Sequence, residues 1–211
     1  MKQELESILS FGAQAVSGEK TIFDQAALRH LDRLMEGNSG YKTTPANPAV
    51  LSQELREGTA KNGQSPLAVI VCCSDSRVPP EHIFHAGIGE LFIIRNAGNL
   101  ISDFALGSVE YAVEHLETPL VVVMGHTGCG AVGTALTPAQ EKGGLAAILA
   151  EIRDAIAGES DPHQAVRKNT LHALATLGHS PILKELHQAG KVEFAAAIYD
   201  IHSGHVDFLQ D

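Results

Sequence analysis

Four short apolar segments constrain the fold of this chain more than any other feature of its sequence. They are LAVIVCC (67–73), ELFIIRN (90–96), PLVVVMGH (119–126) and VEFAAAIYDI (192–201). None of them alternates apolar and polar residues as a half-exposed strand does. We therefore interpret them as buried strands of a parallel sheet.

Segments with helical spacing lie before, between and after these strands. They are AALRHLDRLMEG (26–37), DFALGSVEYAVEHL (103–116), GGLAAILAEIRDAI (143–156) and the run 162–189, in which Gly178 and Pro181 are expected to separate two helices. Strands that alternate with helices predict an α/β fold with a mostly parallel central sheet covered by helices. Residues 38–66 contain NSGYKTTPANP and EGTAKNGQSP, and we expect them to be irregular.

The size and composition predict one domain over residues 1–211. A chain of 211 residues with 44% apolar and 19% charged residues can bury a sizeable core. A helical segment, residues 1–40, precedes the first strand and has no obvious place in the sheet. We expect this arm to pack on a neighbouring subunit.

Charge and hydropathy restrict the partners and the compartment. The formal net charge is -10 and the basic residues are scattered, so nucleic acids and anionic membranes are not expected partners. The apolar run from residue 119 is too short to span a bilayer, and the N-terminus is acidic where a signal peptide would be basic. We therefore expect a cytoplasmic protein, in which three cysteines are ligands, nucleophiles or buried residues instead of a disulfide framework.

The carboxyl ends of two predicted strands carry metal-binding residue types. Cys73 closes the first strand, and His126 and Cys129, in GHTGCGAVG, follow the third. Ligands of open parallel sheets bind at these ends. Two thiolates and an imidazole suit zinc, and three protein ligands leave a fourth position for water. The sequence therefore predicts one zinc site per chain, of the catalytic type.

Asp75 and Arg77 follow the first of these cysteines directly, in VIVCCSDSRVPPEHIF. A carboxylate next to zinc can accept a hydrogen bond from the zinc-bound water and orient it for attack. Without another partner, that carboxylate would tend to bind the metal itself. We expect Arg77 to hold Asp75 through a charge-assisted contact.

Other interpretations of these motifs are weaker. GCGAVG (128–133) matches a dinucleotide-binding turn, but it follows the third strand, and the acids about 20 residues later, Glu151 and Asp154, fall in a predicted helix. A structural zinc site would need a fourth ligand, and Cys72 should point away from Cys73 because strand side chains alternate. A non-catalytic zinc-binding or nucleotide-binding module is the remaining alternative of another class, and the Asp75 and Arg77 pair argues against it.

The motifs together resemble those of a known enzyme family. CSDSRVPPEHIF, ELFIIRNAGNL, SVEYAVEHL, GHTGCGAV and YDIHSGHVDFL are similar, in order and spacing, to the signature blocks of the β-class carbonic anhydrases over roughly residues 30–210. The resemblance implies reversible hydration of carbon dioxide to bicarbonate and a proton by a zinc-bound hydroxide, in a homodimer or tetramer. The implied zinc ligands are Cys73, His126 and Cys129, and the implied catalytic dyad is Asp75 and Arg77.

The resemblance also implies a substrate pocket and a closed state of the metal site, and it raises the question of a second, non-catalytic bicarbonate pocket. The pocket wall would include Ala97, Gly98 and Gly130, and in a closed state Asp75 would leave arginine and become the fourth zinc ligand. One subset of the family binds bicarbonate at a non-catalytic pocket built from Trp, Arg and Tyr. Here Arg95 and Tyr199 match that pocket, but Ile70 stands at the tryptophan position, so we expect no bicarbonate inhibition by that route. An alternative substrate is carbonyl sulfide or carbon disulfide.

Overall fold

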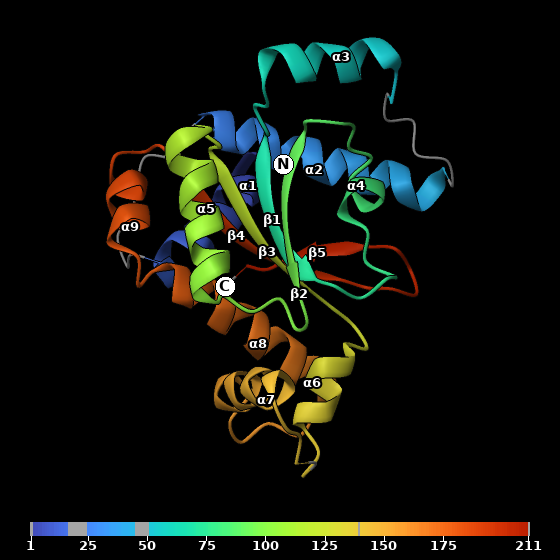
Figure 1. The fold of residues 1–211 in the computed structure, drawn as a ribbon, viewed down its shortest axis with the longest axis vertical. Coiled ribbons are helices and arrows are strands. Elements are labelled where there is room, and N and C mark those ends of the chain that lie inside the picture. Colours follow the sequence, from blue (N-terminus) through green and yellow to red (C-terminus); the bar gives the residue numbers. More distant parts are fainter. Residues whose placement is uncertain (1, 17–24, 45–50, 139, 211) are drawn as a thin grey trace.

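The computed structural model describes residues 2–16, 25–44, 51–138 and 140–210, and its centre is a five-stranded sheet of order β2-β1-β3-β4-β5 (Figure 1). The strands are β1 (Ala68–Cys73), β2 (Leu91–Asn96), β3 (Leu120–His126), β4 (Glu193–Tyr199) and β5 (Val206–Phe208). β1 to β4 are parallel, and β5 pairs with β4 in the antiparallel direction. The α/β fold class predicted from the sequence is confirmed.

The helices surround this sheet. They are α1 (Lys2–Val16), α2 (Gln25–Thr43), α3 (Gln53–Asn62), α4 (Pro80–Ile83), α5 (Asp103–His115), α6 (Gly130–Ala135), α7 (Gly144–Ala155), α8 (Pro162–Leu177) and α9 (Pro181–Gln188). As expected, Gly178 and Pro181 separate the last two. None of the described helices combines the length and the apolar character that crossing a membrane requires.

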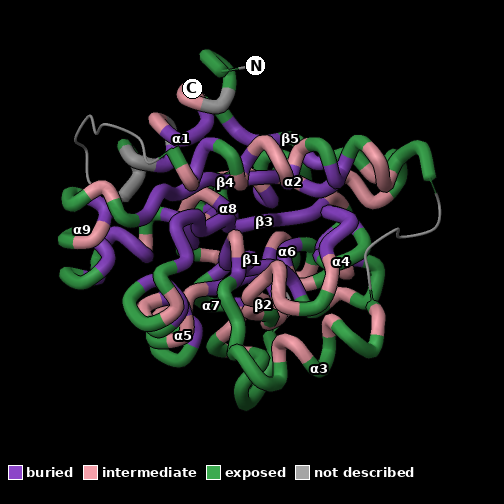
Figure 2. Tube along the Cα trace, turned by 90° about the horizontal axis from the view of Figure 1, so that it is seen from above, coloured by how far each residue is buried: buried purple, intermediate pink, exposed green. Residues whose placement is uncertain are grey.

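Two apolar clusters cover the two faces of the sheet. Ile70 and Cys72 of β1 join α1, α2 and α4 on one face, whereas Val69 and Val71 join α5, α8 and α9 on the other. This division follows from the alternation of side chains along a strand. Because β1, β3 and most of β4 are buried on both faces, they appear as a continuous buried band through the molecule (Figure 2).

The structure differs from the expectation at one strand. β2 has only β1 as a neighbour, and its residues are half-buried, with Arg95 exposed. The prediction that this segment is a fully buried strand is wrong. An apolar run does not reveal whether a strand lies at the centre or at the edge of a sheet.

The prediction of an irregular segment over residues 38–66 is also wrong. α2 continues to Thr43, and α3 occupies much of the remainder. Gly37 and Gly40 do not end α2, because they allow it to approach the carbonyl of Phe84 and the ring of His85 closely. Ser52 starts α3 by accepting a hydrogen bond from the backbone nitrogen of Leu55.

The N-terminal helix packs on the sheet of its own chain. Ile8 and Leu9 are buried in the cluster that α1 shares with α2, and a Cβ atom at Gly12 would overlap the carbonyl oxygen of Phe194 in β4. The predicted contact between the arm and a neighbouring subunit stays a prediction. So does the single-domain assignment of residues 1–211.

A third apolar cluster lies beyond the carboxyl ends of the strands. It joins Cys73 and Cys129 to apolar side chains of α6, α7 and the first half of α8. These helices lie at the opposite end of the molecule from α3 (Figure 1). The cluster therefore surrounds the end of the sheet at which ligands of open parallel sheets bind.

Candidate metal centre

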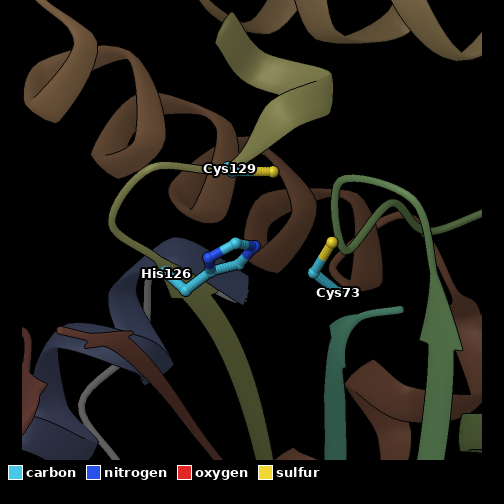
Figure 3. A group of neighbouring side chains, drawn as sticks. All are labelled: Cys73, His126 and Cys129. Atoms are coloured by element: carbon cyan, nitrogen blue, oxygen red, sulfur yellow. The ribbon is translucent and has the colours of Figure 1, made fainter. Parts of the chain in front are cut away.

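The structure brings Cys73, His126 and Cys129 together. One ligand atom of each, the two sulfurs and a ring nitrogen, all lie within 4.8 Å of one another, and all three residues are buried. Their side chains point toward a common centre (Figure 3). Two sulfurs and one nitrogen are a ligand set that suits zinc.

The sheet explains this convergence. β1 and β3 are adjacent parallel strands in which Cys72 pairs with Met124, so the next residues, Cys73 and Gly125, lie at the same level and His126 follows one position later. Cys129 is the residue directly before α6. The positive φ of Gly128, 65°, is a conformation that glycine adopts easily, and the chain turns there between strand and helix.

The tautomer of His126 fits a metal ligand. Nδ1 lies 3.0 Å from the carbonyl oxygen of Thr127, which can only accept, so Nδ1 carries the proton. Nε2 is then an acceptor, and it is buried with no hydrogen-bond partner in the part of the chain that the structure describes. A buried lone pair directed at two sulfurs fits a metal ion at this position.

The two thiols of the site influence each other. The Cys129 thiol donates a hydrogen bond that lowers the pKa of Cys73, and the adjacent Cys73 raises the pKa of Cys129. Both sulfurs can therefore ionise together only when a cation shares their charge. In contrast, burial raises the pKa of Cys72 to about 12, and that thiol belongs to the apolar cluster on the other side of β1.

Asp75 and Arg77 form a two-pronged ion pair beside these ligands. Oδ1 of Asp75 accepts from Nε of Arg77 at 2.9 Å, and Oδ2 accepts from Nη2 at 2.7 Å. The hydrogen bonds from Arg77 hold the pKa of Asp75 well below its usual range. Oδ2 also lies 4.0 Å from Nε2 of His126, so the carboxylate borders the metal-ligand atoms.

Arg95 supports residues 73–77, the segment that carries both the metal ligand Cys73 and the ion pair of Asp75 and Arg77. Sequence reasoning missed this role of Arg95. Its Nε donates to the carbonyl of Cys73 at 3.1 Å, and its Nη2 donates to the carbonyl of Asp75 at 2.7 Å. Arg77 adds a contact of 3.3 Å from Nη2 to the carbonyl of Gly128. The only signal in the sequence is a basic residue in an apolar strand that ends beside Cys73.

The predicted pocket residues lie in two different segments: Ala97 and Gly98 follow β2, and Gly130 directly follows the ligand Cys129. Gly98 is buried, with φ 80°, and its backbone nitrogen donates to Sγ of Cys73 at 3.4 Å. Ala97 is half-buried directly before it, whereas Gly130 is exposed at the start of α6, and open space surrounds the place where a Cβ would be. The pocket role of these three residues stays a prediction.

The structure gives no support to GCGAVG (128–133) as a dinucleotide-binding turn. Residues 130–135 form the short helix α6, and Glu151 and Asp154 both lie in α7. A ribose-binding acid of such a fold should end a strand. No acid of this motif therefore lies where the dinucleotide interpretation requires it.

Comparisons with known proteins agree on one family. A family model described as carbonic anhydrase matches residues 68–206. Carbonic anhydrase 2 of Mycobacterium tuberculosis is 49% identical over 104 residues, which are 49% of this chain and 49% of that protein. The matched part therefore spans about half the length of that relative.

Two further matches cover more of the chain. Carbonic anhydrase of Pseudomonas aeruginosa is 36% identical over 163 residues, which are 69% of this chain and 74% of that protein. The structure of the β-carbonic anhydrase CafA of Aspergillus fumigatus has a TM-score of 0.65 and 32% identity, covering 75% of this chain and 83% of that one. Given these matches, the chain belongs to the β-carbonic anhydrase family.

Proposed function

We propose that this protein catalyses the reversible hydration of carbon dioxide to bicarbonate and a proton with one zinc ion per chain. The observation that carries the proposal is the convergence of Cys73, His126 and Cys129 beside the ion pair of Asp75 and Arg77. Family membership supports the same activity.

The donor atoms fit zinc and define what the metal would contribute. Zinc held by three protein ligands leaves one position for water and lowers the pKa of that water to about 7, the value known for carbonic anhydrases with three histidine ligands. Cys73 and Cys129 would bind as thiolates, and His126 would bind through Nε2. The hydrogen bond from Nδ1 of His126 to Thr127 keeps the ring in the required tautomer.

We propose that Asp75 orients the attacking oxygen. An ionised carboxylate only accepts hydrogen bonds, so it can hold the O–H of the nucleophile and leave a lone pair free for the carbon of the substrate. Arg77 keeps Asp75 ionised and away from the metal position. Because its pKa is held low, Asp75 orients the nucleophile and is a poor store for the product proton, which has to leave by another route.

The substrate side of the proposal rests on the segments that flank the ligands. We propose that backbone at Ala97, Gly98 and Gly130 borders the small apolar molecule carbon dioxide. Apolar side chains, including Leu100 and Ile152, share the third buried cluster with the cysteine ligands, which supports an apolar wall on this side of the site. We also propose a closed state, in which Asp75 leaves Arg77 and becomes the fourth metal ligand.

We further propose a homodimer or tetramer in the cytoplasm. The edge strand β2 carries half-buried apolar side chains, and Phe104 at the start of α5 is 90% exposed. Exposed apolar surface of this kind is typical of interfaces. Free thiols at all three cysteines suit a reducing compartment. Light scattering of the full chain, with Phe104→Glu as the disrupting variant, tests the assembly.

The experiment that tests the function is stopped-flow carbon dioxide hydration on protein assayed for zinc. The variants are Cys73→Ser and Cys72→Ala, which change neighbouring buried cysteines on opposite sides of β1. We expect about one zinc per chain and fast hydration in the parent and in Cys72→Ala. Cys73→Ser should lose both zinc and activity.

Two results would contradict the proposal. One is a parent protein with zinc bound but no hydration between about pH 6.5 and about pH 9, a range that brackets the expected pKa of the water. The other is a Cys73→Ser variant that binds zinc and hydrates carbon dioxide as the parent does.

A further inference from the structure

The backbone nitrogen of Gly98 contacts a sulfur of the metal centre. The N–H donates to Sγ of Cys73 at 3.4 Å in a buried contact. Gly98 lies in the loop that follows β2, with a φ of 80°, and a Cβ there would meet the side chain of Ile152. The direction of this N–H therefore depends on how the loop is held.

Two asparagines hold the loop, one from within and one from outside. Asn96 bridges its base, because Nδ2 donates to the carbonyl of Leu100 and Oδ1 accepts from the Leu100 nitrogen, both at 2.7 Å. Asn169 of α8 reaches its tip, where Nδ2 donates to the carbonyl oxygen of Gly98 at 2.8 Å. Gly98 is thus held at its carbonyl by α8 and directs its N–H at Cys73.

The amide of Asn169 is buried, and its hydrogen bond to the rest of the described chain is the one to Gly98. Asn169 is 1% exposed, and its Oδ1 has no hydrogen-bond partner among the described residues. Nδ2 must face Gly98, because the reversed amide would place two oxygens against each other. The other buried residues of α8 are apolar except Thr170, whose hydroxyl donates to the carbonyl of Val166 in the same helix. An apolar residue would pack there without an unpaired oxygen, so the bond to Gly98 is what an asparagine contributes.

We propose that Asn169 is a positioning residue of the metal centre, which fixes Gly98 so that its N–H stays directed at the Cys73 sulfur. This inference rests on the proposed function, because it assumes that Cys73 binds zinc. A hydrogen bond to a ligand sulfur lowers the electron density that the sulfur donates and fixes its orientation. Groups that orient metal ligands in this way typically change metal affinity about 10- to 100-fold when they are removed.

The test compares Asn169→Leu with the parent full-length protein. Leucine is similar in size and removes both amide atoms. Zinc affinity is measured by competition with a chromophoric chelator, and the sulfur-to-metal charge-transfer band is recorded after cobalt(II) replaces zinc. We expect Asn169→Leu to bind zinc about 10- to 100-fold more weakly and to shift the cobalt band to lower energy, because the sulfur becomes more electron-rich.

A matched control lies on the same helix. The hydroxyl of Thr176 donates to the carbonyl of His172 and does not contact the loop, so Thr176→Val should keep the zinc affinity and the cobalt band of the parent. Asn169→Ala gives the same comparison if the leucine variant does not fold. A folded Asn169 variant with the affinity and the band of the parent would overturn the inference and leave the proposed function intact. A parent that binds no zinc would overturn both.

Discussion

The carboxylate of Asp75 and the guanidinium of Arg77 lie side by side, joined by two parallel hydrogen bonds of 2.9 and 2.7 Å. Asp75 also accepts from the backbone nitrogen of Arg77 at 2.9 Å. Both oxygens are thus held while Oδ2 remains near His126. The geometry leaves the carboxylate able to accept one further hydrogen bond at the edge of the metal site.

Asp75→Asn should therefore reduce carbon dioxide hydration without removing zinc. An amide has one oxygen and one NH2 group, so it cannot accept hydrogen bonds from both Arg77 and the nucleophile as the carboxylate does. It also carries no charge to pair with Arg77. We therefore expect a loss of roughly 100-fold or more in kcat/KM. Stopped-flow assays with zinc analysis measure both quantities. Asp154→Asn, at an exposed position of α7, is the control. Equal activity of the two variants would remove Asp75 from the proposed mechanism.

We predict no inhibition by bicarbonate at a pocket formed by Arg95 and Tyr199. The guanidinium of Arg95 already donates to two carbonyls, and the Tyr199 hydroxyl lies 3.2 Å from that of Tyr41. Burial raises the pKa of Tyr199, so the phenol stays neutral. Initial rates at pH 7 and pH 8.5 should depend hyperbolically on carbon dioxide. Sigmoidal kinetics at the lower pH, made stronger by added bicarbonate, would show that the prediction is wrong.

The ionised carboxylate of Glu159 should stabilise the fold at neutral pH, and this stabilisation should be lost when the carboxylate is protonated at low pH. Its carboxylate accepts from the backbone nitrogens of Asp161 and Ser160 and pairs with Lys168 at 3.1 Å, which lowers its pKa to about 2. The stabilisation is present above the ordinary glutamate pKa of about 4.3 and is lost as the pH falls from there toward about 2.

Glu159→Gln should consequently be less stable than the parent at pH 7, and the difference should shrink as the pH falls to 3. Urea unfolding at several pH values measures it. Glu185→Gln, at an exposed position of α9, should show no such trend. A constant difference for Glu159→Gln down to pH 3 would exclude the carboxylate as its cause.

Gly12→Ala should destabilise the protein by displacing α1. The new methyl group would overlap the carbonyl oxygen of Phe194, and such overpacking typically costs about 1 to 3 kcal/mol. Gly107→Ala is the matched change, because nothing lies within 4 Å of a Cβ at that position of α5. It should stabilise the protein by up to about 1 kcal/mol. Urea unfolding that ranks the two variants in the opposite order would contradict the packing of α1 on β4.

The packing of α1 also shows where sequence reasoning ends. An amphipathic helix ahead of the first strand reveals that it has an apolar face, but it does not reveal which surface covers that face. In the structure Ile8 and Leu9 share one buried cluster with residues of the sheet that are more than 50 positions away in the chain. Such partners depend on the whole fold, and no local pattern encodes them.

The sequence by itself determined the class of the fold and the residue types of the metal centre. Continuous apolar runs identified the parallel strands, and Cys73 and His126 could be assigned to the ends of these runs. An apolar run and the residue that ends it are both local features of the sequence. The tertiary structure decided the rest: the edge position of β2, the hydrogen bonds from Arg95 to the carbonyls of Cys73 and Asp75, and the contact between Asn169 and Gly98. These depend on the order of strands and on contacts up to 71 positions apart, which packing of the complete chain creates.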